Sequence, residues 1–289
     1  MPPHILFVLV DDMGWHFPGY HGNADVRTPT NDALARDGVR LEGMYAYHMC
    51  SPSRSSLLTG RLPWRLAGSV CNLLPGTMPV GPATSYTFLP RHLATAGYFS
   101  AHFGKWHAGY HTPSHTPVGR GFDYSLAVLQ GSSSHWTHAH LGWGIDCGAA
   151  GAPGKGNWDL WEADATSFPG RPVTELVGRQ ADESVYSGLL FSQRAAQLVA
   201  THESGAPLFV LLALEEPHSP LDPPARLEAL YSFADDDRGI KRRFHGLMSV
   251  VEEATATVTA AFTARGWWNN TLMVGMFGIP TLFGSESFA

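Results

Sequence analysis

Short runs of consecutive apolar residues alternate along the chain with longer stretches in which apolar positions recur at helical spacing. Continuous apolar runs predict strands buried on both faces of a sheet at residues 5–10 and 207–214. Further strands are predicted at residues 39–46, 98–103 and in a segment from about 271. The helical pattern, with glycine after several of its stretches, covers residues 28–36, 53–58, 87–96, 182–202 and 240–265. This alternation predicts an α/β fold with a largely parallel sheet flanked by helices.

Composition narrows the class of protein. The 289 residues are 44% hydrophobic and 15% charged, which is typical of a globular chain, and the absence of repeats and linkers favours one domain. The net charge of -6 argues against a nucleic-acid partner, because phosphate binding requires a basic surface. The apolar run at 5–10 is far shorter than the ~20 residues of a membrane span, and no basic residues precede it as in a signal peptide.

Cysteine is scarce and histidine is frequent. Cys50, Cys71 and Cys147 are too few for a disulfide framework, and whether Cys71 pairs with Cys147 stays open. Fifteen histidines mildly favour an enzyme, since histidine serves in proton transfer and metal binding. One glycosylation acceptor pattern occurs at residues 269–271.

Polar side chains follow three of the predicted strands. Asp11 and Asp12 come after the first, Lys105 and His107 after the strand at 98–103, and His218 after the strand at 207–214. Each has an ordinary structural interpretation by itself: an acidic turn, a surface lysine or a packing histidine. Because parallel strands end at one edge of a sheet, their common position predicts one shared site, in which paired carboxylates suit a hard divalent cation.

The most specific feature is the segment around Cys50. A thiol near a helix N-terminus with Arg54 one turn away predicts a lowered thiol pKa and an anion site; the alternative is a buried structural cysteine in a serine-rich turn. The complete string is more informative, with Cys-Ser-Pro-Ser-Arg at 50–54 and Leu-Thr-Gly-Arg at 58–61. That string resembles the signature of the type I sulfatases.

Four further segments carry the same resemblance. They are Pro-His-Ile-Leu-Phe-Val-Leu-Val-Asp-Asp-Met-Gly-Trp at 3–15, Gly-Lys-Trp-His at 104–107, Pro-His-Ser-Pro at 217–220 and Trp-Asn-Asn-Thr at 268–271. They resemble, in order, the family's first strand with its metal pair, its lysine–histidine motif, its second histidine motif and the approach to its last metal strand. The chain is most similar to the arylsulfatase B and N-acetylgalactosamine-4-sulfatase group.

The resemblance implies a fold, a reaction and a modified residue. The fold is an alkaline-phosphatase-like sulfatase N-terminal domain, with a large mixed, mostly parallel sheet between helices. The reaction is hydrolysis of small-molecule or glycan sulfate monoesters. Cys50 would be oxidised to formylglycine by the formylglycine-generating enzyme, with Pro52 and Arg54 helping to specify the conversion. The hydrated aldehyde would then attack sulfur.

It also assigns roles to the residues at the strand ends. Asp11 and Asp12, with the residue made from Cys50, would hold a divalent cation, calcium on family grounds. Arg54, Lys105 and His218 would surround the sulfate, and His107 would be the base. The family enters the secretory pathway, which implies a lysosomal or extracellular location, although no signal peptide precedes residue 5.

One departure from the family lies near residue 275. The family's last metal strand ends in Ser/Thr-Asp-Asn-Gly, whereas this chain continues Gly-Met-Phe-Gly-Ile-Pro at 275–280. We therefore expect a sulfatase catalytic domain at 3–274, truncated on its C-terminal side, and a divergent tail at 275–289. Two alternatives follow: a catalytically impaired sulfatase fragment that lacks the Asp-Asn ligands, and a phosphatase or phosphodiesterase of the same fold with Ser or Thr as nucleophile.

The stretch 131–172 is rich in Gly, Ser, Trp and His without periodicity, and it predicts a long surface excursion near the site. Its tryptophans would line a sugar-binding rim or pack the excursion, with packing slightly favoured; they are Trp136, Trp143, Trp158 and Trp161. Its histidines, His135, His138 and His140, fit a polar loop better than a metal site.

Overall fold

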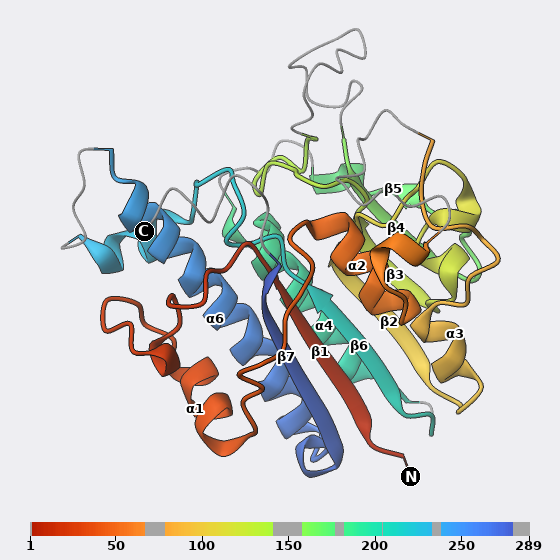
Figure 1. Cartoon of the computed structure of the whole chain (residues 1–289), viewed down its shortest axis with the longest axis horizontal. Helices are drawn as coiled ribbons and strands as arrows, with labels where there is room; N and C mark the ends of the chain where they lie inside the picture. Colours follow the sequence, from red (N-terminus) through yellow and green to blue (C-terminus); the bar gives the residue numbers. More distant parts are fainter. Residues whose placement is uncertain are drawn as a thin grey trace, which may run out of the picture.

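A mixed seven-stranded sheet forms the centre of the described chain. The computed structural model describes residues 2–66, 79–140, 158–176, 182–203, 205–232 and 238–279, and for 277–279 the backbone alone. The strands are β1 (His4–Asp11), β2 (Phe99–Lys105), β3 (Tyr124–Val128), β4 (Leu160–Asp164), β5 (Arg171–Pro172), β6 (Leu208–Ala213) and β7 (Thr271–Ile279). They lie in the order β5-β4-β3-β2-β6-β1-β7 (Figure 1).

Five neighbouring strands are parallel, as the sequence predicts. β1 pairs with β6 and β7, and β2 pairs with β3 and β6, all in parallel. The antiparallel strands β4 and β5 extend the sheet at one edge. The parallel strands therefore bring their carboxyl ends to one edge of the sheet, which is the upper edge in Figure 1.

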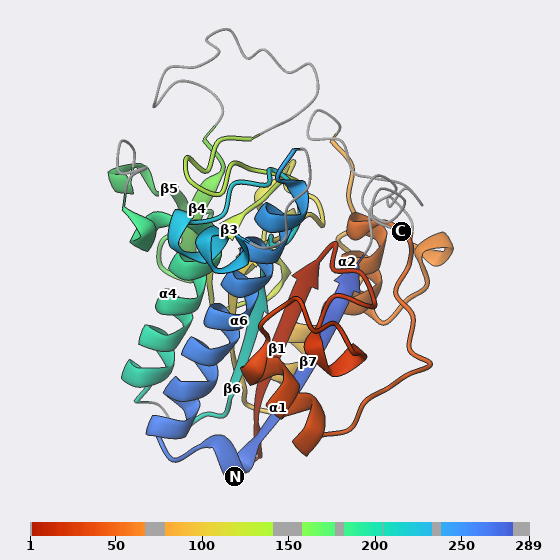
Figure 2. The same ribbon diagram turned by 90° about the vertical axis from the view of Figure 1, so that its left-hand side faces the viewer.

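Helices cover both faces of the sheet. They are α1 (Pro29–Asp37), α2 (Cys50–Thr59), α3 (Leu89–Ala94), α4 (Ser187–Thr201), α5 (Ala225–Glu228) and α6 (Ile240–Ala264). Figure 2 shows α4 and α6 side by side on one face and α2 on the other. The two faces are thus both shielded from water, as the uninterrupted apolar strands require.

Alternate side chains of β1 enter two separate cores. Leu6 and Val8 pack in the core that α4 and α6 cover, together with Phe262 of α6. Phe7 and Leu9 pack in the opposite core, which includes Cys50 at the start of α2. Phe262 is fully buried, and truncating such a ring to alanine typically costs roughly 3–5 kcal/mol. Burial on both faces fixes β1 firmly, and with it the site residues at its end.

The structure corrects the secondary structure expected from the sequence at three places. Residues 39–46 form no strand, since Val39 and Leu41 are 88% and 66% exposed and no strand lies beside them. The sequence prediction missed β3, a five-residue strand with a serine at its second position. The excursion at 131–172 contributes β4 and β5 to the sheet, so part of it belongs to the folded body.

The remaining elements differ from their predictions mainly at their ends. α4 begins at Ser187, after a short 3-10 turn at Glu183–Val185, and α3 is confined to Leu89–Ala94. Among the described residues, none of the helices combines the length and apolar character needed to cross a membrane. Cys71, Cys147 and Trp143 lie outside the described residues.

Candidate active site

Cys50 is the first helical residue of α2. The residue before it, Met49, has an extended backbone and caps the helix, so Cys50 lies within the first turn rather than ahead of it. α2 packs on the sheet beside the end of β2, where Sγ of Cys50 lies 3.2 Å from Nδ1 of His107. The two residues are 57 positions apart in the chain, and the fold brings a thiol against an imidazole.

The expected lowering of the Cys50 thiol pKa is wrong for this structure. The thiol is 1% exposed, and burial raises its pKa by disfavouring the thiolate. Lys105 and Arg54 act in the opposite direction without overcoming this effect, and Asp11 adds to the rise. The unmodified cysteine is therefore a neutral thiol at pH 7, which makes it a poor nucleophile in its own right.

Asp11 lies at the centre of a buried group of charges. Its carboxylate contacts Nζ of Lys105, and Oδ1 lies 3.6 Å from Nη2 of Arg54. All three side chains are at most 2% exposed. Burial favours the neutral carboxyl, but Lys105 and Arg54 outweigh it and lower the pKa of Asp11 to about 2.

Arg54 joins α2 to the end of β2. Its Nη1 donates a hydrogen bond of 2.7 Å to the carbonyl oxygen of Lys105. The same guanidinium faces Asp11 through Nη2, so one side chain contacts two of the strand ends. Burial lowers the pKa of Lys105, but Asp11 and the nearby thiol outweigh that effect and raise it; the lysine stays charged.

His218 lies on the loop after β6 and faces Asp12. Its Nε2 is 3.5 Å from Oδ2 of Asp12, and its Nδ1 lies 2.7 Å from the carbonyl oxygen of Ser219. Burial and the positive charge of Lys105 lower the pKa of His218 to about 4, so the ring is neutral at pH 7. The backbone N–H of Asp11 donates to the Glu216 carbonyl at 3.3 Å and holds this loop against β1.

Gly131 is a site residue that the sequence did not reveal. A Cβ added there would fall 2.4 Å from Cε1 and 2.6 Å from Nε2 of His107, so only glycine leaves room for the imidazole. His107 itself has a φ of 48°, and its N–H donates to the carbonyl of Leu129 at 3.2 Å. A glycine inside a glycine- and serine-rich stretch carries no single-sequence signal of such a contact.

The predicted site residues therefore meet at one edge of the sheet. Contacts among described atoms connect Cys50 with His107, Asp11 with Lys105 and Arg54, and Asp12 with His218. These pairs come from β1, α2, the end of β2 and the loop after β6.

The donors at this edge fit a hard divalent cation in part. Two adjacent carboxylates, Asp11 and Asp12, are the ligand type such a cation prefers, and the Oδ1 atom of Asp11 accepts no hydrogen bond from the described residues. Three or more His, Cys, Asp or Glu side chains arranged as a metal site are not found in the described part of the chain. β7 ends beside Asp11, with Ile279 in register with it, and the sequence of this strand lacks the Asp-Asn pair that the family resemblance implies there.

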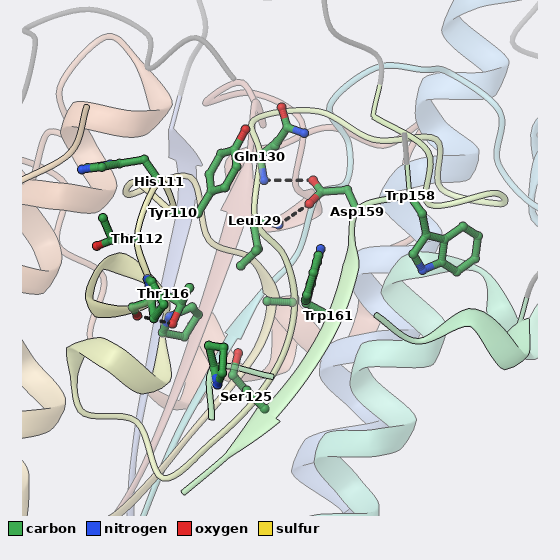
Figure 3. A pocket seen from close by; sticks show the side chains of 15 residues that line it. Tyr110, His111, Thr112, Thr116, Ser125, Leu129, Gln130, Trp158, Asp159 and Trp161 are labelled. Atoms are coloured by element: carbon green, nitrogen blue, oxygen red, sulfur yellow. Dashed lines mark hydrogen bonds between the residues drawn. The ribbon is translucent and has the colours of Figure 1, made fainter. Parts of the chain in front are cut away.

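A cavity of about 330 Å³ lies on the β3–β4 side of the sheet and does not include the seven predicted site residues. Asp159 forms part of its wall and accepts hydrogen bonds from the N–H groups of Leu129 and Gln130, at 3.1 and 2.9 Å (Figure 3). Burial raises the pKa of Asp159 to about 8 despite these donors. Trp158 and Trp161 also line this cavity, so the choice between a sugar rim and packing stays open for them.

Trp136 packs within the fold rather than on a rim. Its Nε1 donates to the Asp222 carbonyl at 2.8 Å, and its ring lies edge-on to Tyr186 at 4.8 Å between centroids. His135 and His138 are buried in the same loop, each with hydrogen-bond partners of its own.

Comparison with known proteins defines the class to which this fold and site belong. A family model described as "Sulfatase" matches residues 3–276. Arylsulfatase J of Mus musculus is 34% identical over 98% of this chain, and N-acetylgalactosamine-6-sulfatase of Homo sapiens is 31% identical over 76% of it. The crystal structure of Ps i-CgsB in complex with k-i-k-neocarrahexaose superposes with a TM-score of 0.80 at 26% identity over 95% of this chain.

The chain belongs to the sulfatase family. It spans 44% of the length of the mouse arylsulfatase J, 40% of the human N-acetylgalactosamine-6-sulfatase and 58% of the Ps i-CgsB chain. The predicted family and fold class are confirmed. The narrower likeness to the N-acetylgalactosamine-4-sulfatase group stays a prediction.

Proposed function

We propose that this protein hydrolyses sulfate monoesters, of sulfated sugars or of aryl alcohols, through a formylglycine made from Cys50. The observation that carries the proposal is the 3.2 Å contact between Sγ of Cys50 and Nδ1 of His107 at the start of α2. It supports a role for His107 as the general base that acts on the side chain of residue 50. The family membership supports the reaction, and the name of the N-acetylgalactosamine-6-sulfatase supports a sugar sulfate as the substrate class.

The neutral, buried thiol argues for conversion to the aldehyde. Burial raises the pKa of Cys50, so the unmodified residue would supply little thiolate at neutral pH. Once formed, the aldehyde at residue 50 supplies a hydrate oxygen that can attack sulfur. His107 is placed to take the proton of the residue 50 side chain, and Gly131 keeps the imidazole in that position.

The charges around Asp11 indicate why a cation is needed. Arg54 and Lys105 bring two positive charges, and Asp11 and Asp12 cancel them, while His218 is neutral because its pKa is lowered to about 4. A sulfate monoester is an anion, and preorganised positive charge is typically the largest catalytic contribution for such a substrate. A divalent cation on Asp11 and Asp12 would restore a net positive charge and polarise the sulfate oxygens.

We propose calcium as that cation, with the side chain of residue 50 as a further ligand. Arg54 would stabilise the residue 50 side chain and hold α2 to the end of β2, as its bond to the Lys105 carbonyl supports. His218 and Lys105 would contact the sulfate. The formylglycine-generating enzyme is then a required partner, and the protein would pass through the secretory pathway to the lysosome or the outside of the cell.

A second candidate function is a catalytically impaired sulfatase. The observation that favours it is the register of β7, which places Ile279 beside Asp11, while residues 275–279 contain no carboxylate or amide side chain. Two carboxylates would bind calcium more weakly than a complete set of oxygen ligands. In that case the protein would bind sulfated glycans with little or no turnover.

The test is release of inorganic sulfate from a generic aryl sulfate. Protein produced together with the formylglycine-generating enzyme, in calcium, should release sulfate, and the Cys50→Ala variant should fold normally and release none. An aryl phosphate with the same leaving group serves as the comparison and should turn over far more slowly. Equal turnover by Cys50→Ala, or preference for the phosphate, would overturn the proposed reaction.

A further inference from the structure

The loop that carries His218 is held by a second loop, residues 132–136. Nε2 of His135 donates a hydrogen bond of 3.1 Å to the backbone carbonyl oxygen of His218. In the same pair of loops, the hydroxyl of Ser133 donates to Oε1 of Glu215 at 2.8 Å. The backbone of His218 is therefore held by the side chain of His135, which belongs to the second loop.

The ring of His135 is buried among carboxylates. It is 1% exposed, and Nδ1 lies 3.6 Å from Oε1 of Glu216. Burial lowers the pKa of His135, but Glu216 and Glu215 outweigh this effect and raise it. The ring therefore has a carboxylate on its Nδ1 side, and its Nε2 donates the hydrogen bond to the His218 carbonyl.

Neighbouring contacts fix the position of this ring. The N–H of Ser187, at the start of α4, donates to the His135 carbonyl at 2.9 Å. The carboxylate of Glu216 is held in turn by the N–H of Gly188 at 2.9 Å. The helix α4 thus provides a rigid support behind both members of the pair, and the bond to His218 extends from that support.

The same loop also reaches the other candidate histidine. Gly131, directly before the loop, packs against the ring of His107. One continuous segment, 131–135, therefore contacts both His107 and the backbone of His218, and a shift of this segment would move both rings relative to residue 50.

We propose that His135 is a positioning residue that fixes His218 toward Asp12 and the substrate through its hydrogen bond to the His218 carbonyl. This inference rests on the proposed function for its catalytic consequence. Residues that orient a catalytic group commonly change activity by about 10–100-fold when replaced, because a displacement near 1 Å at the reacting centre is costly.

Two amide substitutions separate positioning from burial. In His135→Gln the amide nitrogen occupies the place of Nε2 and still reaches the His218 carbonyl. In His135→Asn it occupies the place of Nδ1 and loses that bond. Both variants remove the ring and its charge, so their cost to stability is similar. They differ in the group that the amide reaches, which is the His218 carbonyl for Gln and the Glu216 side for Asn.

We expect kcat for an aryl sulfate to stay within roughly threefold of wild type in His135→Gln, and to fall by about tenfold or more in His135→Asn, with KM changed little. The matched control is His138→Asn, since His138 follows this loop, is equally buried and contacts Ser187 of α4 rather than the His218 loop. It should leave kcat unchanged. Equal kcat in the two His135 variants would overturn the proposal.

A second readout does not depend on turnover. In ¹H–¹⁵N spectra of the histidine rings at one fixed pH, the His218 signals should move in His135→Asn and stay in place in His135→Gln and His138→Asn. If wild type shows no sulfate release, the proposed function fails, and these spectra still decide the positioning role. If neither His135 variant folds, wild type must show a slowly exchanging Nε2 proton on His135, as the bond to the His218 carbonyl requires, and its absence would overturn the proposal.

Discussion

The imidazole of His107 lies between the thiol of Cys50 and the backbone of Gly131. Nδ1 of His107 is 3.2 Å from Sγ of Cys50, and a Cβ at position 131 would come within 2.4 Å of Cε1 on the same ring. The ring therefore has no room to move away from residue 50 on that side. This arrangement links the Cys50–His107 contact to a glycine that is distant from both residues in the sequence.

Gly131→Ala should lower kcat and change the free energy of unfolding little. The new methyl group overlaps the His107 ring and must displace it, so we expect kcat for an aryl sulfate to fall by about tenfold or more, as for other losses of positioning. The matched control is Gly205→Ala, because nothing lies within 4 Å of a Cβ at that position. Activity of Gly131→Ala equal to that of Gly205→Ala would contradict the steric role.

Asp11→Asn should destabilise the fold strongly. The substitution leaves the buried cations Lys105 and Arg54 without a compensating charge, a change that typically costs roughly 3–5 kcal/mol. Asp12→Asn is the comparison, since the side chain of Asp12 is 10% exposed and faces a neutral His218. Urea unfolding without added metal should show a much larger loss for Asp11→Asn, and equal losses would contradict the charge balance.

Asp159 should make stability depend on pH. Its pKa is raised from 3.8 to about 8 in the folded protein, so the folded state retains a proton that the unfolded state has lost. Its contribution to stability is fully present below pH ~4 and is lost as the pH rises through ~8, with a slope of up to about 1.4 kcal/mol per pH unit. Urea midpoints at pH 5 and pH 8 measure this slope.

The matched variant for this prediction is Asp159→Asn, which cannot ionise. Wild type and Asp159→Asn share all other titrating groups. The difference between their changes of stability with pH is therefore due to Asp159. We expect wild type to lose more stability than Asp159→Asn between pH 5 and pH 8. An equal loss in the two proteins would show that the two backbone donors, Leu129 and Gln130, keep the carboxyl ionised.

Ile279→Asp should strengthen calcium binding. The backbone of Ile279 is in register with Asp11 on the neighbouring parallel strand, and carboxylate oxygens are the donors that calcium prefers. We expect at least about tenfold tighter binding by titration calorimetry, and no gain in Ile279→Ala. Equal affinity in wild type and Ile279→Asp would show that the end of β7 does not contribute to the metal site.

The sequence was sufficient to predict which residues gather at the site. Asp11, Lys105, His107 and His218 each lie at or after the end of a strand, and parallel strands end at one edge. Periodicity could not predict which side chains pair there. The Lys105–Asp11 contact joins residues 94 positions apart, and it depends on how two strands separated by β6 face one another.

Two local predictions were wrong for a common reason, because both depend on burial. A helix N-terminus and an arginine favour the thiolate, but the packing of α2 against the sheet buries Cys50 and reverses the direction of its pKa. The residues 39–46 have an apolar pattern, yet Val39 is exposed because no strand lies next to it. A local sequence pattern gives the types of the residues, whereas the tertiary fold determines which of them are buried.

The central claim is that the side chain of residue 50, as formylglycine, performs sulfate hydrolysis. The most direct measurement compares preparations with different aldehyde content, determined by mass spectrometry of the peptide that contains residue 50, with their initial rates of sulfate release. The account predicts a rate proportional to the aldehyde fraction and no release from protein that retains the thiol. Equal rates in thiol-only and aldehyde-rich preparations would contradict it.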